Sequence, residues 1–520
     1  MNALIIHGHF YQPPRENPWT GIIDPQPGAQ PYHDWNERIH DECYGPNAFA
    51  HIVGPRGTIQ RTVNNYARIS FNFGPTLLSW LEGHHPRTYQ RILEADRESA
   101  SNRGGHGNAI AQAYGHAILP LCNERDRLTQ VLWGMADFRY RFGREPESLW
   151  LPETACNNEV LNLLIEQGLR FVILAPSQAE RYRQEGQWHA VVDGGIDTTR
   201  AYRYVHRDGS GRSIAVFFYH GAIARAIAFE GVLSSSRSLV NMFMHAAQRG
   251  LAGSPAGQPG CSASLVNVAT DGETYGHHFK FGDLCLAHAL EVEAQAQDFW
   301  ITNYAQFLDR YPPDCDVEIK EGLDGGTSWS CAHGVGRWIR DCGCSGETGW
   351  NQKWRDPLRV ALNFLRDATA RHFETLGSDL FLDPWAARNG YIQVILDHGR
   401  SRAEFLSRHV KQPLSPADEV CALTLLEIQR NSLLMFTSCG WFFSEISGIE
   451  TIQIMKYAAR VIELMDELGL PSPRHQFLEI LAEAKSNIER LGTGVDIFLN
   501  YVEPSASLTH NISDAEARLS

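Results

Sequence analysis

Two acidic residues in unusual surroundings are the first candidates for chemistry in this sequence. Glu153 ends the run Leu149-Trp150-Leu151-Pro152-Glu153, and Asp271 follows the apolar run 264–269. Most Asp and Glu side chains are solvated surface charges, but the neighbours of these two are Trp, Pro, Gly, Tyr and His. Two carboxyl groups at the ends of two strands are what glycosidic bond cleavage requires: one attacks or stabilises the anomeric carbon, and the other protonates the leaving oxygen.

Each carboxyl group also has a structural explanation. Glu153 follows a proline that marks a strand end and precedes an expected helix, whose N-terminal dipole favours a carboxylate. Asp271 and Glu273 lie two residues apart and offer oxygen ligands for a calcium or magnesium ion. The other Asp or Asn ligands of a calcium loop are missing nearby. We therefore favour Asp271 as an acid, with Glu273 contacting the substrate or supporting Asp271.

Several histidines are candidates for substrate contacts. His7 and His9 alternate on one expected strand and so share a face, where they would bind a metal or hydrogen-bond a sugar unit; for His7, burial in the core is the alternative. His277 would bond a sugar hydroxyl or Asp271, with a packed loop histidine as the alternative. His106 and Asn108 lie in a glycine-rich loop that lets the backbone approach a ligand, although its spacing is not that of a phosphate-binding loop.

Residues 328–354 are rich in Trp and Cys. Cys331, His333, Cys342 and Cys344 raise the question of zinc, but their spacing differs from that of paired zinc knuckles, so we favour thiols without an ion. Trp329 is a candidate sugar platform. Trp441, further along the chain, is a candidate for a residue that closes the cleft, with core packing as its alternative.

The expected elements place both carboxyl groups at strand ends. Short apolar strands at 3–6, 148–151, 168–174, 214–218 and 265–269 alternate with amphipathic helices such as 124–142. This alternation predicts a parallel sheet, which we expect to close into a barrel. Catalytic groups of such barrels lie at the C-terminal strand ends. After about residue 350 the pattern is helical, including 356–371, 416–469 and 476–491, whereas 181–212 reads as a hairpin or loop excursion. We predict a catalytic barrel over 1–350 and a helical domain over 351–520.

Composition excludes some classes of protein. The chain has 520 residues and a formal net charge of −14, which argues against a nucleic-acid binder. No stretch has the roughly 20 apolar residues of a membrane span, and no secretory signal follows Met1. An odd number of cysteines, 11, predicts no disulfide framework and a cytoplasmic location. We expect no cofactor.

Four short motifs of the sequence resemble those of glycoside hydrolase family 57. His7-Gly8-His9-Phe10-Tyr11-Gln12-Pro13 resembles the first family motif, with two residues between His9 and Gln12, and Gly105-His106-Gly107-Asn108 is similar to the second. Trp150-Leu151-Pro152-Glu153 resembles the third, whose Glu is the family nucleophile. Asp271-Gly272-Glu273 with Tyr275-Gly276 resembles the fourth, whose Asp is the general acid/base.

The resemblance implies a seven-fold β/α barrel followed by a helical bundle. It also implies a retaining mechanism on α-glucan, with Glu153 as nucleophile, Asp271 as general acid/base and no metal in the chemistry. Hydrolysis, glycosyl transfer and branching remain open, because they differ only in what resolves the glycosyl-enzyme. The predicted substrate-binding residues are His7, His9, Gln12, His106, Asn108, Trp150, Glu273, Tyr275, His277, Trp329, His333 and Trp441.

Two other functions are weighed against this one. A metal-dependent deacetylase on a related barrel would use Asp271, His7 and His9 around a zinc ion, but a clear set of Asp and His ligands is missing. A non-catalytic glycan-binding protein would have no need to keep both carboxyl groups.

Overall fold

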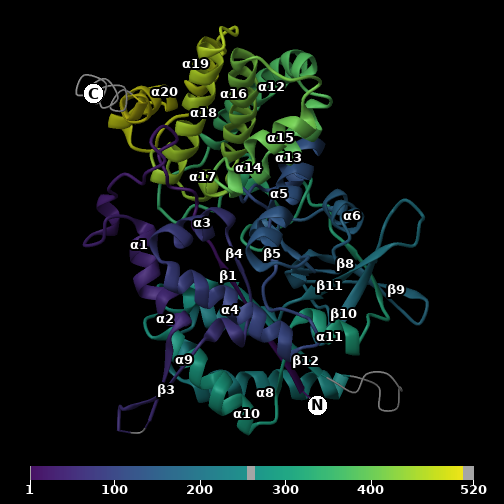
Figure 1. The fold of residues 1–520 in the computed structure, drawn as a ribbon. Coiled ribbons are helices and arrows are strands. Elements are labelled where there is room, and N and C mark those ends of the chain that lie inside the picture. Colours follow the sequence, from purple (N-terminus) through teal and green to yellow (C-terminus); the bar gives the residue numbers. More distant parts are fainter. Residues whose placement is uncertain (1, 55, 254–263, 507–520) are drawn as a thin grey trace.

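The computed structural model describes residues 2–54, 56–253 and 264–506. Figure 1 shows an α/β part, coloured purple to teal, below a cluster of helices coloured green to yellow. The predicted helical C-terminal region is confirmed, because every helix from α12 (Arg355–Leu380) onward belongs to it and the described residues beyond Arg355 include no named strand. No helix among the described residues is long and apolar enough to cross a membrane.

Seven parallel strands form the centre of the α/β part. Ladders join β12 to β1, β1 to β4, β5 to β6 and β7 to β11, while single bridges link Phe71 to Ala109 and Ser148 to Phe171. The order is therefore β12-β1-β4-β5-β6-β7-β11. The seven strands are β1 (Asn2–Phe10), β4 (Ser70–Phe73), β5 (Ala111–Gln112), β6 (Leu149–Trp150), β7 (Phe171–Leu174), β11 (Ser213–Phe218) and β12 (Ser264–Asp271).

Between β11 and β12, the described residues include no ladder. The contact there consists of isolated hydrogen bonds, such as the one that the His220 backbone N–H donates to Asn267 O at 2.8 Å. A closed seven-stranded barrel therefore stays a prediction. β13 (Trp300–Ile301) pairs in parallel with the start of β1.

Strand β1 is a long, buried strand at the centre of the fold. All its residues after Asn2 are buried, as expected for a central parallel strand covered on both faces. The apolar run predicted only residues 3–6, but the strand continues to Phe10. His7 and His9 consequently lie inside the strand, with their side chains in the core.

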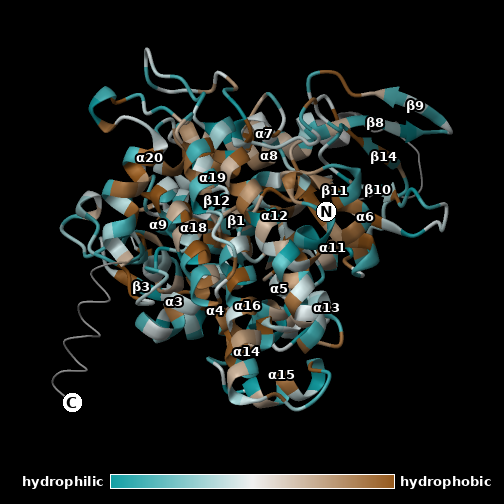
Figure 2. Cartoon of the chain, turned by 90° about the horizontal axis from the view of Figure 1, so that it is seen from above, coloured by the Kyte–Doolittle hydropathy of each residue, from teal (hydrophilic) through white to brown (hydrophobic). Residues whose placement is uncertain are grey.

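A second group of strands extends the sheet away from the centre. β8 and β9 form an antiparallel hairpin that pairs with β14, and β14 pairs in turn with β10 beside β11. The predicted hairpin within 181–212 is thus confirmed, and it appears as a hydrophilic projection in Figure 2. Besides β13, the strands outside the central seven are β2 (Ala50–Val53), β3 (Ile59–Val63), β8 (Ala179–Gln184), β9 (Gln187–Ala190), β10 (Ala201–Val205) and β14 (Asp316–Ile319).

Helices follow most of the central strands. The amphipathic pattern predicted 124–142, and α5 has the same bounds. The Gly, Pro and Ser residues of 250–262 predict a loop, but residues 250–253 are the end of α8, and 254–262 lies outside the described residues. The helices of this part are α1 (Trp35–Ile39), α2 (Gly45–Ala48), α3 (Pro75–His84), α4 (Pro86–Asn102), α5 (Glu124–Phe142), α6 (Asn158–Glu166), α7 (Gly221–Phe229), α8 (Ser236–Gly253), α9 (Gly282–His288), α10 (Ala294–Ala296) and α11 (Tyr304–Arg310).

The helical part is built on α12, α16 and α18, which share a core that includes Trp338, Trp354 and Trp441. The prediction of a helix over 476–491 was too long. α19 ends at Leu481, because the Glu445 carboxylate accepts hydrogen bonds from Ser486 Oγ (2.6 Å) and Asn487 N–H (2.8 Å) and draws the chain into a turn. The other helices are α13 (Pro384–Gly390), α14 (Ile392–Leu396), α15 (Arg402–His409), α16 (Pro416–Leu434), α17 (Cys439–Phe442), α18 (Ile449–Glu467), α19 (Arg474–Leu481) and α20 (Gly494–Ile497).

A buried ion pair joins the two parts. Arg388 on α13 donates to Asp126 on α5 at 2.7 Å and to Thr129 Oγ1 at 2.8 Å. The exposed fractions of the two charged side chains are 3% and 10%. Removing one partner of such a pair leaves the other charge buried without compensation.

We therefore expect Arg388→Ala to lower the free energy of unfolding by about 3–5 kcal/mol, measured by chemical denaturation. Arg402→Ala is the matched control, since its pair with Glu419 is solvent-exposed and is expected to contribute less than about 1 kcal/mol. Adding Asp126→Ala to Arg388→Ala should restore part of the loss. Equal effects of the two single variants would contradict this interpretation.

Candidate active site

Glu153 lies in a short turn directly after β6, in an unusual backbone conformation. Glu153 (φ 59°) and Thr154 (φ 48°) are both left-handed, which costs about 1–3 kcal/mol for a residue with a side chain and is found where the surrounding structure over-determines the backbone. Here Gln178 Nε2 donates to Thr154 O at 2.8 Å, and Trp329 N–H donates to Glu153 O at 3.0 Å. The strained turn aims the Glu153 side chain at residues 329 and 330.

Two donors bind the Glu153 carboxylate. Trp329 Nε1 and Ser330 Oγ both donate to Oε2, at 3.0 Å and 2.6 Å. Burial raises the pKa of Glu153 above its ordinary value, while these hydrogen bonds and the positive charge of Arg337 lower it. The donors therefore favour the ionised form of a half-buried carboxyl group.

Asp271 is the last residue of β12 and pairs with His9 across the ladder to β1. The next residue must be glycine, since a Cβ on Gly272 would lie 2.3 Å from Phe10 Cδ1. Burial, followed by the negative charge of Glu153, raises the pKa of Asp271 to about 7. The Asp271 side chain is open to a cavity, so solvent there reduces the effect of burial on the pKa. The Glu153 charge still raises the pKa. As pH rises, Glu153 therefore loses its proton before Asp271 does.

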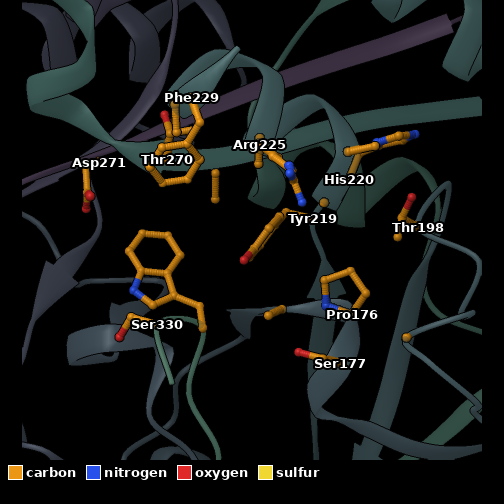
Figure 3. Close-up of a pocket in the computed structure, with 18 of the residues that line it drawn as sticks. Pro176, Ser177, Thr198, Tyr219, His220, Arg225, Phe229, Thr270, Asp271 and Ser330 are labelled. Carbon is orange, nitrogen blue, oxygen red and sulfur yellow. The ribbon is translucent and has the colours of Figure 1, made fainter. Parts of the chain in front are cut away.

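Asp271 lines a cavity of about 690 Å³ at the C-terminal ends of β7, β11 and β12. Figure 3 shows Asp271, Tyr219 and Ser330 around this space, with Pro176 and Ser177 on another side. Trp329 and Phe442 also line it. The Trp329 and Tyr219 rings meet edge to face with centroids 6.2 Å apart. The volume and this mixture of aromatic and polar groups are typical of a small-molecule site.

Sequence reasoning missed several residues of this cavity: Tyr219, Arg225, Phe229, Ser330 and Phe442. Tyr219 comes directly after the predicted strand 214–218, so the strand-end rule that selected Glu153 and Asp271 would have found it. The negative charge of Asp271 contributes, after burial, to the raised pKa of Tyr219. Phe442 is next to the predicted Trp441, and only the fold reveals which of the two faces the cavity.

The predicted residues His7, His9 and Trp150 form a buried stack. Trp150 stacks on His7 and His9 with centroids 4.8 Å and 4.9 Å apart, and it meets Trp329 edge to face at 5.2 Å. His7 bonds Ser70 Oγ (3.0 Å) and Asn72 Oδ1 (3.1 Å). Burial lowers the pKa of both histidines to about 3, so both are neutral. The stack contacts the cavity through Trp329, which lines it.

Other predicted residues do not line the cavity. Glu273 is buried, and its Oε1 accepts from Tyr11 N–H (2.9 Å) and Tyr44 OH (2.6 Å). Tyr275 is fully buried and its hydroxyl accepts from Thr270 Oγ1 at 3.1 Å. Gln12 and His277 are held in place by Arg15 (2.8 Å) and by Glu42, respectively.

The structure does not bring the remaining predicted residues to the cavity. His106 bonds Glu147 (2.9 Å) and Asp309 (2.7 Å). Because Glu147 precedes β6, this cluster and the adjacent Asn108 lie at the N-terminal ends of the strands, opposite Glu153. Trp441 is fully buried, with the Arg359 guanidinium 4.1 Å from its ring centroid. His333 lies near Cys331, Cys342 and Cys344.

The parallel strands of this α/β protein carry Glu153 and Asp271 at their C-terminal ends, and Asp271 lines the cavity. The profile of glycosyl hydrolase family 57 matches residues 33–318, more than half of the chain, and the chain therefore belongs to this family. The predicted identification is confirmed. A second profile, described as a domain of unknown function (DUF3536), matches residues 350–517.

Two solved structures share the fold. An exo-type maltose-forming amylase from Pyrococcus sp. ST04 is 16% identical with a TM-score of 0.68, over 92% of this chain and 82% of that one. A branching enzyme of the same family from Pyrococcus horikoshii is 14% identical with a TM-score of 0.54, over 95% and 96%. At these identities the likeness shows the fold alone. A curated relative, alpha-amylase 1 of Dictyoglomus thermophilum, is 24% identical over 107 residues, which span 20% of this chain and only 15% of that protein.

The pKa of Glu273 leads to a prediction about stability. Burial, with a contribution from the Asp271 charge, raises it to about 8. Between the ordinary pKa of a glutamate and this value, the folded chain holds a proton that the unfolded chain has lost, so the free energy of unfolding falls as pH rises. Glu273→Gln lacks this group. We expect the variant to gain stability relative to the wild type as pH rises from about 5 to 8, by at most about 1.4 kcal/mol per pH unit.

Denaturation at several pH values measures this difference. Glu180→Gln is the control, since Glu180 is exposed on β8 and the stability difference of this variant from the wild type should stay flat across the same range. A Glu273→Gln difference that is equally flat would show that Glu273 titrates normally.

Proposed function

We propose that this protein is a retaining enzyme that acts on α-glucan, with Glu153 as nucleophile and Asp271 as general acid/base. The observation that carries the proposal is the unequal environment of the two carboxyl groups. Glu153 receives two hydrogen bonds that favour its ionised form, whereas burial and the Glu153 charge keep the proton on Asp271 up to about pH 7. A nucleophile and an acid with separated pKa values are what a two-step displacement needs.

Each step uses these two side chains. The Glu153 carboxylate attacks the anomeric carbon while the Asp271 carboxyl group gives its proton to the glycosidic oxygen, so the glycosidic bond breaks and a glycosyl ester forms. The Asp271 carboxylate then takes a proton from the incoming acceptor hydroxyl, which attacks the same carbon and releases Glu153. The configuration is retained because each of the two displacements inverts the anomeric carbon.

The cavity supports a sugar substrate. Trp329, Tyr219 and Phe442 offer flat apolar faces, and Ser330, His220 and Thr270 offer polar groups around the same space. Family membership favours α-glucan, and the structural neighbours include a maltose-forming amylase and a branching enzyme. Water as the acceptor gives hydrolysis and a sugar hydroxyl gives transfer or branching, so the access of water to the cavity decides between them.

We also propose that the seven parallel strands act as the barrel of the family, and that the chain divides near residue 350 into a catalytic and a helical domain. The order of the strands and the bridges between them support the first point. The start of α12 at Arg355 supports the second.

The deacetylase alternative finds no support in the side-chain arrangement. Among the described residues, the group of His, Cys, Asp and Glu side chains that could hold a metal ion includes neither Asp271 nor His7 nor His9. The ring nitrogens of His7 already bond Ser70 and Asn72.

We expect Glu153→Gln to reduce turnover of maltooligosaccharides by several orders of magnitude while the thermal midpoint stays close to that of the wild type, because the amide keeps the shape but cannot form the ester. A 5-fluoro-glycosyl fluoride should label Glu153 in the wild type, identified by peptide mass spectrometry. Glu180→Gln, at an exposed position on β8, is the control and should remain active. Labelling of another carboxyl group would refute the assignment.

The raised pKa of Asp271 predicts the basic limb of the pH profile. Because the acid must be protonated, kcat/KM on maltooligosaccharides should fall above about pH 7, approaching tenfold per pH unit. Asp271→Asn should lower kcat/KM on these substrates by about 10²–10⁴-fold and abolish the limb. An aryl glycoside whose leaving group needs no proton should lose much less in this variant. Equal losses on both substrates would exclude Asp271 as the acid.

A further inference from the structure

Three cysteines and one histidine converge beside the proposed active site. Cys331, His333, Cys342 and Cys344, hereafter the cysteine–histidine cluster, present ligand atoms that all lie within 4.8 Å of one another. Cys344 Sγ is 3.5 Å from His333 Nδ1. Among the described residues this is the group of His, Cys, Asp and Glu that could hold a metal ion. We propose that the cluster binds one structural zinc ion.

The geometry is close to that of a tetrahedral site. With the usual Zn–S and Zn–N bond lengths, neighbouring ligand atoms in such a site are about 3.5–3.8 Å apart, so the four side chains need to move by about an ångström. Three thiolates and one imidazole fill the four positions and leave none open, which is the pattern of a structural site. Sulfur-rich ligands favour zinc over magnesium or calcium.

The short spacing that counted against zinc in the sequence is explained by the local backbone. Gly343, between Cys342 and Cys344, has φ +76°, a conformation that glycine adopts without strain. Its N–H donates to Asp341 Oδ1 at 3.1 Å, which holds the turn. The turn brings both thiols toward Cys331 and His333, so a pair separated by one residue serves in place of a standard knuckle.

Arg355 is a second, independent indication. Its side chain is fully buried, and it donates to Cys342 Sγ (3.7 Å) and to the carbonyl oxygens of Phe442 and Phe443 (both 3.2 Å). Arg355 has no ion pair with a carboxylate among the described residues. A buried cation needs compensation, and zinc with three thiolates and a neutral imidazole carries one negative charge. Arg355 would then also orient a ligand through a hydrogen bond to its sulfur.

The location explains what the ion would do. Between β14 and α12 the chain runs from residue 320 to 354 with only one short 3-10 turn, Gly336–Trp338. A connection of this length without regular structure is unusual in a compact protein, and a metal that fixes it contributes its binding free energy to the fold. Cys331 directly follows Ser330, a donor to Glu153, so zinc would anchor the segment that positions the proposed nucleophile.

The test measures metal on the full-length protein, so its outcome does not depend on the proposed activity. Protein expressed with zinc in the medium and passed through gel filtration with a mild chelator should hold about one zinc per chain by elemental analysis. Cobalt in its place should show the visible absorption bands of tetrahedral thiolate coordination. A glucan-inactive protein that holds zinc would refute only the proposed function, and an active protein without zinc would refute only this site.

Variants identify the ligands. The exposed His333 can be replaced without loss of core packing, so His333→Ala should fold and lose most of its zinc to the chelator, whereas His333→Cys should retain it. Cys342→Ser should also lose zinc. Cys421→Ser on α16, a half-buried cysteine outside the cluster, is the matched control and should keep one equivalent. Zinc retained equally in His333→Ala and Cys342→Ser, iron in place of zinc, a disulfide among the cluster cysteines, or metal-free thiols that take up no zinc would each overturn the proposal.

Discussion

The hydrogen bonds between residues 329–330 and Glu153 are the interaction on which the proposed site depends. Ser330 Oγ and Trp329 Nε1 donate to the carboxylate, and the Trp329 backbone N–H donates to the Glu153 carbonyl. The same segment thus holds both the left-handed backbone of the turn and the orientation of its side chain. Without these donors, the half-buried carboxylate would bind a proton more readily and would then be a poor nucleophile.

This segment also connects the two parts of the molecule, so the helical part influences the site directly. Arg337 donates to Ser330 O (3.0 Å) and to Phe442 O (3.1 Å). These bonds connect residues 329–330 to α17. Phe442 in turn lines the cavity. A shift of the helical part would therefore change both the cavity wall and the hydrogen bonds to Glu153, although both proposed catalytic residues belong to the α/β part.

Sequence patterns predicted the helices and strands better than they predicted which side chains are buried. Hydrophobic periodicity predicted the 124–142 helix and the helical C-terminal region. The points at which apolar runs stop predicted the strand ends that carry Glu153 and Asp271. Patterns cannot tell whether a side chain at a strand end faces a cavity or the core. Asp271 is open to the cavity, but Glu273, two residues later, is buried against Tyr11 and Tyr44. His106 was selected by its glycine-rich loop, and only the chain path shows that this loop is at the other end of the strands. Residues 320–354 lack periodicity, and so their convergence could not be derived from spacing.

The third carboxyl group, Glu273, completes the electrostatic argument. The Asp271 charge raises the pKa of Glu273, and the Glu153 charge raises that of Asp271, while Glu153 itself is stabilised by two donors and the positive charge of Arg337. The three groups therefore lose their protons in sequence, beginning with Glu153. Near neutral pH, Glu273 is mostly protonated and still accepts hydrogen bonds from Tyr11 and Tyr44, so it supports the loop after β12 without adding a negative charge. A charged Glu273 would raise the pKa of Asp271 further, above the range in which a general acid donates its proton efficiently. The burial of Glu273 thus keeps Asp271 near the pKa that proton transfer to a leaving sugar requires.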